Sequence, residues 1–282
     1  MSLKESITSL DIKKIFRNKI TKFNYLNELY EEIQLDKAIF VGSQQLDEQI
    51  IDTWNYEISK KVIRQLFKNT DKYKYIQGCK NTIDEAINDW KELKLGDFEW
   101  PFRAMNFDQY VHRLNRRTDI TEIEKDDLLC KDIIKFRRIK NINALRNDYI
   151  EYLIFQNDNV IPTFGNVSGI DFYIDGNPFD QKVAKSVGND FINMYRENYR
   201  QIAIDNPNLV AVSMYQNQDE ERFGDEPRLL IVYLDSDVSS KQIESQLSSI
   251  NFSQPIQISF DYRHKDGIRT HNTNCFVVLL HN

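Results

Sequence analysis

The chain has 282 residues, a formal net charge of −6 and a sequence pI of about 5.4. Hydrophobic residues make up 41% and charged residues 28%, which is typical of a globular protein with one large core or two smaller ones. No apolar run approaches the roughly 20 residues that a membrane-spanning helix requires. The composition therefore predicts no contact with a membrane, and the acidic balance argues against a general polyanion binder.

The first residues and the cysteines indicate a cytoplasmic protein. The opening Met-Ser-Leu-Lys-Glu-Ser lacks the basic and then apolar layout of a secretion signal. Cys79, Cys130 and Cys275 lie far apart, and an odd set without metal-ligand spacing is typical of a reducing compartment. Because His264 and His271 fall in a polar stretch that predicts a loop, we expect solvated side chains there and not a metal site.

Helical spacing dominates the first part of the chain. From residue 5 to about 98, apolar residues recur every three or four positions, as at Ile50, Trp54 and Ile58. The segment 96–101 contains Gly and Pro and interrupts this pattern, and a further helix is predicted after Asn106. We expect residues 1–130 to form a helical region and residues 131–282 to form an α/β domain.

The second part begins with a helix and then turns to strands. A helix is predicted over residues 142–155, and a sheet begins at 159–162. Two apolar-rich runs, 170–175 and 179–184, then read as adjacent strands. A helix is predicted to follow over residues 188–204.

The remaining elements complete an α/β pattern. Residues 209–214 and 228–234 are near-continuous apolar runs, as expected of strands buried on both faces. A helix that Ser239 caps is predicted to run through Ile250. Residues 256–260 and 276–280 predict antiparallel strands that a long loop connects. The order predicts a mixed central sheet flanked by helices.

The two runs around Gly176-Asn177 predict a hairpin. Glycine adopts positive φ without steric cost and asparagine tolerates it, so this pair is expected to form a two-residue loop. Asp171 then faces Lys182, and Tyr173 faces Asp180. Side chains alternate across a strand, so Asp171, Asp180 and Lys182 share one face. The other face takes the apolar side chains of Ile170, Phe172, Ile174, Phe179 and Val183.

A four-residue loop keeps this arrangement, whereas a three-residue loop places Asp171 on the other face. Two carboxylates and an ammonium group on an otherwise apolar hairpin are costly unless they bind something. Mg²⁺ prefers oxygen ligands, keeps several waters and needs only one or two carboxylates. The trio therefore suits Mg²⁺-assisted hydrolysis of a phosphate ester. The alternative is a surface hairpin with a cross-strand Asp–Lys pair that contributes at most about 1 kcal/mol.

The pattern Asp171…Asp180-Gln181-Lys182, on adjacent strands after a helix, resembles the PD-(D/E)XK nuclease superfamily. This superfamily includes most type II restriction endonucleases, several repair nucleases and junction resolvases. The resemblance covers roughly residues 140 to 235. Ile170 stands where a proline often precedes the first aspartate, which is a loosely kept position.

The resemblance implies a restriction endonuclease-like core that hydrolyses phosphodiester bonds of double-stranded DNA with Mg²⁺ and leaves a 5′-phosphate. Asp171 and Asp180 are then expected to hold Mg²⁺ with a backbone carbonyl near Gln181. Lys182 is expected to position the attacking water. In this superfamily the preceding helix often adds an acidic residue, and Glu151 is the candidate.

A homodimer is also implied, since two cuts in opposite strands suit two-fold symmetry. The helical region 1–130 would then serve target recognition, the dimer contact or both. Asp148 is a second acidic candidate on the helix before the hairpin, and a solvated carboxylate at Glu151 remains the alternative.

Cations gather in two stretches despite the acidic total. They are candidates for contact with the DNA backbone, and a solvated helix face is the alternative reading. The expected contacts are Arg113, Arg116, Arg117, Arg137, Arg138, Lys140, Arg146 and Lys185. The predicted loop 263–274 adds a secondary candidate through Arg263, His264, Lys265 and Arg269.

Two other functions remain open at this stage. One is a structure-specific repair nuclease or junction resolvase, with RNA as a further possible substrate. The other is a catalytically silent DNA-binding or scaffolding protein in which Asp171, Asp180 and Lys182 are surface pairs. The sequence has no glycine-rich phosphate loop at a strand-to-helix junction, so nucleotide hydrolysis ranks low.

Overall fold

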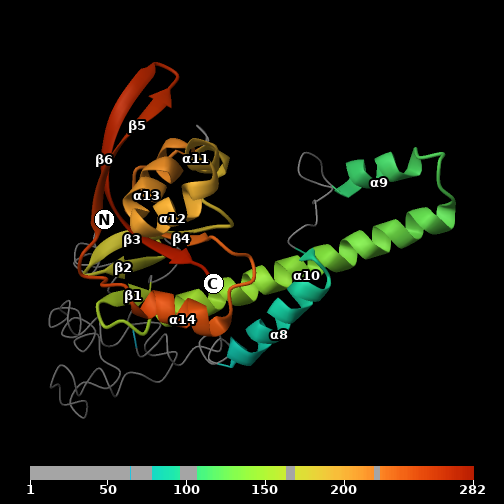
Figure 1. Cartoon of the computed structure of the whole chain (residues 1–282), viewed down its shortest axis with the longest axis horizontal. Coiled ribbons are helices and arrows are strands. Elements are labelled where there is room, and N and C mark those ends of the chain that lie inside the picture. The colour runs from blue at the N-terminus through green and yellow to red at the C-terminus, as the bar shows by residue number, and fades with distance from the viewer. Residues whose placement is uncertain (1–63, 65–77, 96–106, 163–168, 219–222) are drawn as a thin grey trace, which may run out of the picture.

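A mixed six-stranded sheet organises the chain (Figure 1). The computed structural model describes residue 64 and residues 78–95, 107–162, 169–218 and 223–282. In spatial order, the strands are β1 (Val160–Pro162), β2 (Phe172–Ile174), β3 (Asn177–Ala184), β4 (Arg228–Tyr233), β6 (Gly267–Leu280) and β5 (Ile256–His264). β3, β4 and β6 run parallel, whereas β2 and β5 are antiparallel to their neighbours.

One face of the sheet is covered by α8 (Cys79–Glu92), α10 (Glu122–Ile154) and α14 (Ser240–Ser248). Their apolar side chains enclose one core with residues from β2, β3, β4 and β6, including Phe172, Phe179 and Ile231. The capping box of α14 confirms its predicted start, because the Ser239 side chain accepts a hydrogen bond from the Gln242 backbone N–H.

The other face is covered by α11 (Asn189–Tyr195), the 3₁₀ turn η2 (Arg196–Asn198), α12 (Tyr199–Asp205) and α13 (Pro207–Gln216). A second core lies here, between these helices and side chains such as Leu230, Val232 and Phe260. Two helical layers therefore enclose the sheet, and the predicted class, a mixed central sheet flanked by helices, is confirmed (Figure 1).

Two predictions on this second face are wrong. Residues 209–214 belong to the helix α13 and not to a strand, since Pro207 stands at its start and a short apolar run has no period that separates a buried helix from a buried strand. The single helix predicted over 188–204 is divided into α11, η2 and α12. Arg196 has a φ of 49°, which lies outside the helical range and ends α11.

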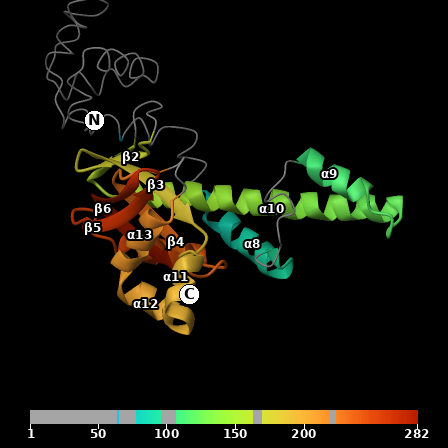
Figure 2. The same ribbon diagram turned by 90° about the horizontal axis from the view of Figure 1, so that it is seen from above.

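The helix α10 is one continuous helix of 33 residues, whereas the sequence predicted a helix over residues 142–155. Thr121 and Glu124 form a capping box at its start, and no Gly or Pro interrupts residues 122–154. The predicted boundary between residues 130 and 131 lies within this helix. Figures 1 and 2 both show its N-terminal part extending away from the sheet together with α9 (Phe107–Asn115).

The strands β5 and β6 are longer than predicted and form one β-ribbon. Their pairing continues from Ile256↔Cys275 to His264↔Gly267, so only Lys265 and Asp266 remain as the loop. The loop predicted over residues 263–274 is therefore wrong. Half of the ribbon's side chains face solvent and are polar, so its sequence resembles that of a polar loop.

The helical pattern predicted for residues 5–98 lies largely outside the described residues. The exceptions are residue 64 and residues 78–95, where α8 agrees with the prediction. Asn106, the predicted cap of α9, also lies outside them. Within the described part of the chain, no helix is both long enough and apolar enough to cross a membrane.

Candidate active site

The β2–β3 hairpin turns at Asp175-Gly176, one residue earlier than predicted. Both residues have positive φ, 49° and 81°, which is the backbone of a type I′ turn. The register is therefore Ile174↔Asn177, Tyr173↔Pro178 and Phe172↔Phe179. The predicted pairs Asp171–Lys182 and Tyr173–Asp180 are wrong.

The displaced turn leaves every side chain on its predicted face. The predicted loop and the observed loop each contain two residues, so the pairing of β2 with β3 shifts by an even number of positions. Phe172, Ile174, Phe179 and Val183 all pack into or against the core beneath α8, α10 and α14. The opposite face of β3 therefore presents Asp180 and Lys182.

Asp171 precedes β2 and lies against β3. Its backbone N–H donates to the Phe179 carbonyl over 3.0 Å, and its Oδ2 accepts the Gln181 N–H over 2.7 Å. In a strand, the N–H and C=O of one residue point to the same side. The backbone carbonyl of Gln181 therefore also faces the side on which Asp171 lies.

The carboxyl groups of Asp171 and Asp180 are close enough to interact. Burial and the charge of Asp171 raise the pKa of Asp180 to about 6, although Arg228 and Lys182 oppose the shift. The side chain of Asp180 is half-buried on the α11–α13 face of the sheet. Two carboxylates that repel each other and face two cations are a site where a divalent cation would be stabilised.

Arg228 is the residue of this site that the sequence did not indicate. It begins β4 and pairs with Asp180 in the parallel register, which places its Nε 3.5 Å from Asp180 Oδ2. Its Nη1 donates to Gln218 Oε1 over 2.8 Å, and its guanidinium lies over the ring of Tyr215 at 5.1 Å. These contacts hold the guanidinium beside the carboxylate. Only the β3–β4 register brings the two residues together.

A cavity of about 430 Å³ opens beside Lys182 and Arg228 on this face of the sheet, and neither Asp171 nor Asp180 lines it. Lys182 and Arg228 line it from the sheet, and the β3–α11 connection and the end of α13 supply the other walls. Lys182 is exposed here, two residues after Asp180 on the same strand. The cavity thus presents two positive groups, one of which pairs with Asp180, and this suits the binding of a phosphate group.

Glu151 does not join this group. Among the residues that the structure describes, no set of three or more His, Cys, Asp or Glu side chains lies together in a way that could hold a metal ion. The physical reason is that α10 packs on the opposite face, where Tyr149, Ile150 and Ile154 enter the core. Neither Glu151 nor Asp148 is therefore a third acidic ligand in this conformation.

The remaining donors still fit Mg²⁺. Asp171 and Asp180 provide two carboxylates, and the Gln181 carbonyl faces the same side, which is enough for an ion that keeps several waters. A bound cation would offset the repulsion from Asp171, which after burial is the second cause of the raised pKa of Asp180. Arg228 is the competing cation, at 3.5 Å from Asp180.

The predicted DNA contacts are dispersed. Arg113, Arg116 and Arg117 are exposed on or just after α9, which Figures 1 and 2 place far along α10 from the sheet. Arg137 and Lys140 are exposed on α10, and Lys185 is exposed just after β3. None of these six lines the cavity beside Asp180.

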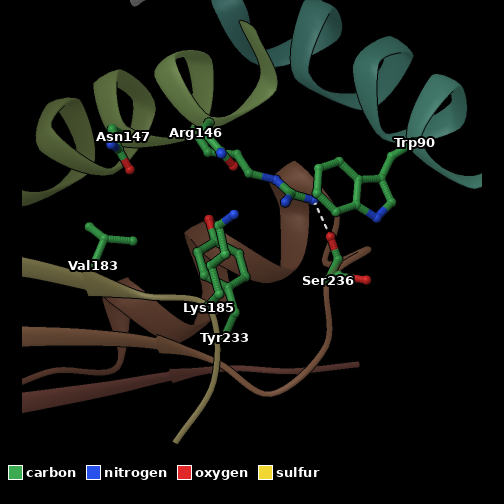
Figure 3. Close-up of a pocket in the computed structure, with 8 residues that line it drawn as sticks. Trp90, Arg146, Asn147, Val183, Lys185, Tyr233 and Ser236 are labelled. Atoms are coloured by element: carbon green, nitrogen blue, oxygen red, sulfur yellow. Dashed lines mark hydrogen bonds between the residues drawn. The ribbon is translucent and has the colours of Figure 1, made fainter. Parts of the chain in front are cut away.

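Two further predicted contacts are engaged within the protein. Arg138 donates to the Asp89 carboxylate of α8. Arg146 is only 4% exposed and lies over the rings of Trp90 and Tyr233 (Figure 3). The prediction that Arg146 contacts DNA as a surface cation is wrong, because the buried face of α10 carries it into the core.

The β5–β6 ribbon projects from the end of the sheet at which the paired aspartates lie. One row across the sheet joins Asp180, Arg228, Cys275 and Ile256. Residues 257–274 all lie beyond this row, so the ribbon tip is roughly 30 Å away at about 3.3 Å per residue. Figure 1 shows the ribbon extending past the other strands.

His264 and His271 form a pair on this ribbon, contrary to the prediction of separate solvated side chains. Their Nε2 atoms are 3.0 Å apart, and His271 Nδ1 is 2.8 Å from Asp225 Oδ2. Phe223 packs against both rings at 4.8 Å. The strand pairing brings the histidines together, and a residue outside the ribbon orients one of them.

The fold and the site together define an α/β protein in which paired aspartates lie beside a lysine and an arginine at one end of the central strands. Comparisons with protein-family models, curated proteins and solved structures found no match to this chain.

Proposed function

We propose that the protein is a Mg²⁺-dependent endonuclease that hydrolyses phosphodiester bonds in double-stranded DNA, of the restriction type in the PD-(D/E)XK superfamily. The observation that carries this proposal is the convergence of Asp171 and Asp180 on one side of the hairpin, with Lys182 on the same face. The order of a helix, a strand, a hairpin, helices and a parallel strand from α10 to β4 also supports it.

Each side chain of the site has a separate role in the proposed reaction. Asp171 and Asp180 would hold Mg²⁺ together with the Gln181 carbonyl, and the ion would supply an acidified water and charge stabilisation at the scissile phosphate. Lys182 orients the attacking water by hydrogen bonding and offsets negative charge. Asp171 keeps its position because the Gln181 N–H binds its Oδ2 over 2.7 Å.

Arg228 adds a role that the sequence pattern did not contain. Its guanidinium neutralises Asp180 in the structure at 3.5 Å, and it also lines the cavity with Lys182. Because it lines the cavity, the guanidinium is placed to bind a phosphate oxygen there, since a planar fork binds oxyanions well. Arg228 is thus a candidate for binding the transition state.

Double-stranded DNA and a second copy of the chain are the proposed partners. Double-stranded DNA is the proposed substrate, and the projecting β5–β6 ribbon is placed to reach a groove when the backbone lies at Asp180. A homodimer in the cytoplasm is proposed, because cutting both strands suits two-fold symmetry.

The test is cleavage of long duplex DNAs of diverse sequence with Mg²⁺ or with a chelator. We expect discrete products only with Mg²⁺. Asp171→Asn, Asp180→Asn and Lys182→Ala should each reduce the cleavage rate roughly 100-fold or more. Asp127→Asn is the matched control, since Asp127 is exposed on α10 far from the site, and it should cleave like the wild type.

Metal titration by calorimetry gives an independent reading. The wild type should bind Mn²⁺ or Mg²⁺ more tightly than Asp171→Asn, while Asp127→Asn should match the wild type. A wild type that leaves all DNAs intact, and binds metal no better than Asp171→Asn, would show that these residues are surface pairs. Cleavage confined to branched DNAs or flaps would indicate a repair nuclease or a junction resolvase.

A further inference from the structure

A second cavity, of about 180 Å³, lies on the other face of the sheet (Figure 3). It is bounded by α8, α10, the ends of β3 and β4 and the segment after β4. Its lining residues are Trp90, Asn143, Arg146, Asn147, Val183, Lys185, Tyr233 and Ser236. Lys185 follows Asp180 by five residues, roughly 16 Å along the strand direction, so this cavity is separate from the candidate active site.

Arg146 is a buried cation on which the charge of Asp237 acts, although the two form no ion pair. Its side chain is 4% exposed, and its Nη2 donates to the Ser236 carbonyl over 2.6 Å. Among the described residues it makes no ion pair, and its Nε is buried without a hydrogen-bond partner. Burial lowers the pKa of this guanidinium. An unpaired buried charge is costly, so a partner with negative charge would stabilise this arrangement.

Aromatic side chains hold Arg146 in place, and one of them has a buried hydroxyl group without a hydrogen bond. The guanidinium lies 5.5 Å from the ring centroid of Trp90 and 5.2 Å from that of Tyr233. The Tyr233 hydroxyl is likewise buried without a hydrogen-bond partner. Two orphaned buried polar atoms at one cavity are rare in native proteins and need an explanation.

Lys185 adds a second cation at the rim. In Figure 3, Lys185 and Tyr233 rise from the strands toward α10, while Arg146 reaches from α10 toward Trp90 and Ser236. The cavity lies on one face of the sheet at the carboxyl ends of the parallel strands β3 and β4, close to where open α/β sheets commonly bind ligands.

We propose that this cavity binds a small organic anion, whose carboxylate or phosphate group meets Arg146, Lys185 and the Tyr233 hydroxyl. The amides of Asn143 and Asn147 supply further hydrogen bonds. A cavity of roughly 150 Å³ accepts one benzene ring, so the apolar part of the ligand is no larger than a single ring. Val183 and the two aromatic side chains form the apolar wall for that ring.

The experiment is a calorimetric titration of the full chain with phenyl phosphate, benzoate and inorganic phosphate, and with phenol as the neutral probe. We expect saturable 1:1 binding of at least one of the three anions and none of phenol. Preference for phenyl phosphate or for benzoate identifies the acidic group. Lys185→Met should weaken anion binding about tenfold, whereas Lys241→Met, an exposed lysine on α14, should leave it unchanged.

Arg146→Lys tests the buried group, because it keeps the charge but removes the planar fork, and it should also weaken binding. Where Arg146→Lys does not fold, as judged by circular dichroism, the exposed positions Lys185 and Asn147 decide the question through Lys185→Met and Asn147→Ala. Absence of saturable binding to the wild type would overturn the proposal. So would equal affinity of the wild type and Lys185→Met, since the anion would then lie elsewhere.

Discussion

Asp180 shows how a single residue depends on its neighbours. Four charged groups, Asp171, Asp180, Lys182 and Arg228, act on one another across adjacent strands. Burial and Asp171 raise the pKa of Asp180 to about 6, and the two cations only reduce that shift. The two carboxylates and the two cations balance in formal charge, and burial is the largest cause of the shift. A divalent ion bound between the carboxylates would offset the repulsion between them, which is the physical basis for the proposed Mg²⁺ site.

The raised pKa predicts a stability effect with a definite sign. The pKa of the Asp180 carboxyl is about 6 in the folded protein, against an ordinary aspartate value of 3.8, so the folded state holds this proton more tightly than the unfolded chain. Deprotonation thus costs stability as pH rises from about 4 to 6, and the cost remains above about pH 6. Asp180→Asn should raise the thermal midpoint at about pH 7.5 more than at about pH 4.5.

Thermal unfolding without divalent cations, at about pH 4.5, 6.0 and 7.5, measures this difference. Asp127→Asn is again the control, since Asp127 is exposed on α10. A gain from Asp180→Asn that is the same at all three pH values would mean that the carboxyl titrates normally.

At the scale of elements, the hairpin turn sets the register that brings Asp171 against β3. Asp175 and Gly176 both need positive φ, which glycine adopts freely and aspartate tolerates. Gly176→Ala should destabilise the protein by about 1–2 kcal/mol, whereas Asp175→Asn should change stability by less than about 0.5 kcal/mol. Urea unfolding measures both. Equal effects of the two changes would show that the turn is not under this backbone constraint.

The wrong predictions on the second face also belong to this scale. The run Leu-Val-Ala-Val-Ser-Met is consistent with a strand or with a buried helix. In the structure it belongs to α13, which packs against β5 and β6 and ends at Gln216. This packing has a consequence for the site, because the end of α13 supplies Tyr215. Gln218 follows two residues after the helix, and both side chains hold Arg228.

At the scale of the whole molecule, the paired aspartates lie where the β5–β6 ribbon leaves the sheet. Its tip carries the exposed cations Arg263, Lys265 and Arg269. On the proposed function, the triple change Arg263→Gln, Lys265→Gln and Arg269→Gln should weaken binding to duplex DNA. The slope of log affinity against log salt should fall by roughly 0.9 for each phosphate contact that is lost.

Fluorescence anisotropy with labelled duplex DNA, at several salt concentrations and with Ca²⁺ in place of Mg²⁺, measures that slope. Lys241→Gln on α14 is the matched loss of an exposed cation and should leave the slope unchanged. An unchanged slope in the triple variant would place the DNA away from the ribbon, even if the aspartates are catalytic.

The amino-acid sequence by itself determined the α/β class, the faces of the β2–β3 hairpin and the start of α14. These features depend on the residues of a turn, on the alternation of side chains between the two faces of a strand and on helix capping. Each involves only a few neighbouring residues, so the sequence is sufficient to predict them. Only the tertiary structure decided that Arg228 meets Asp180, that Arg146 is buried beside Trp90, and that Glu151 stays apart. Those contacts depend on strand register and on which helix face packs inward, and both are set by burial across segments distant in the chain.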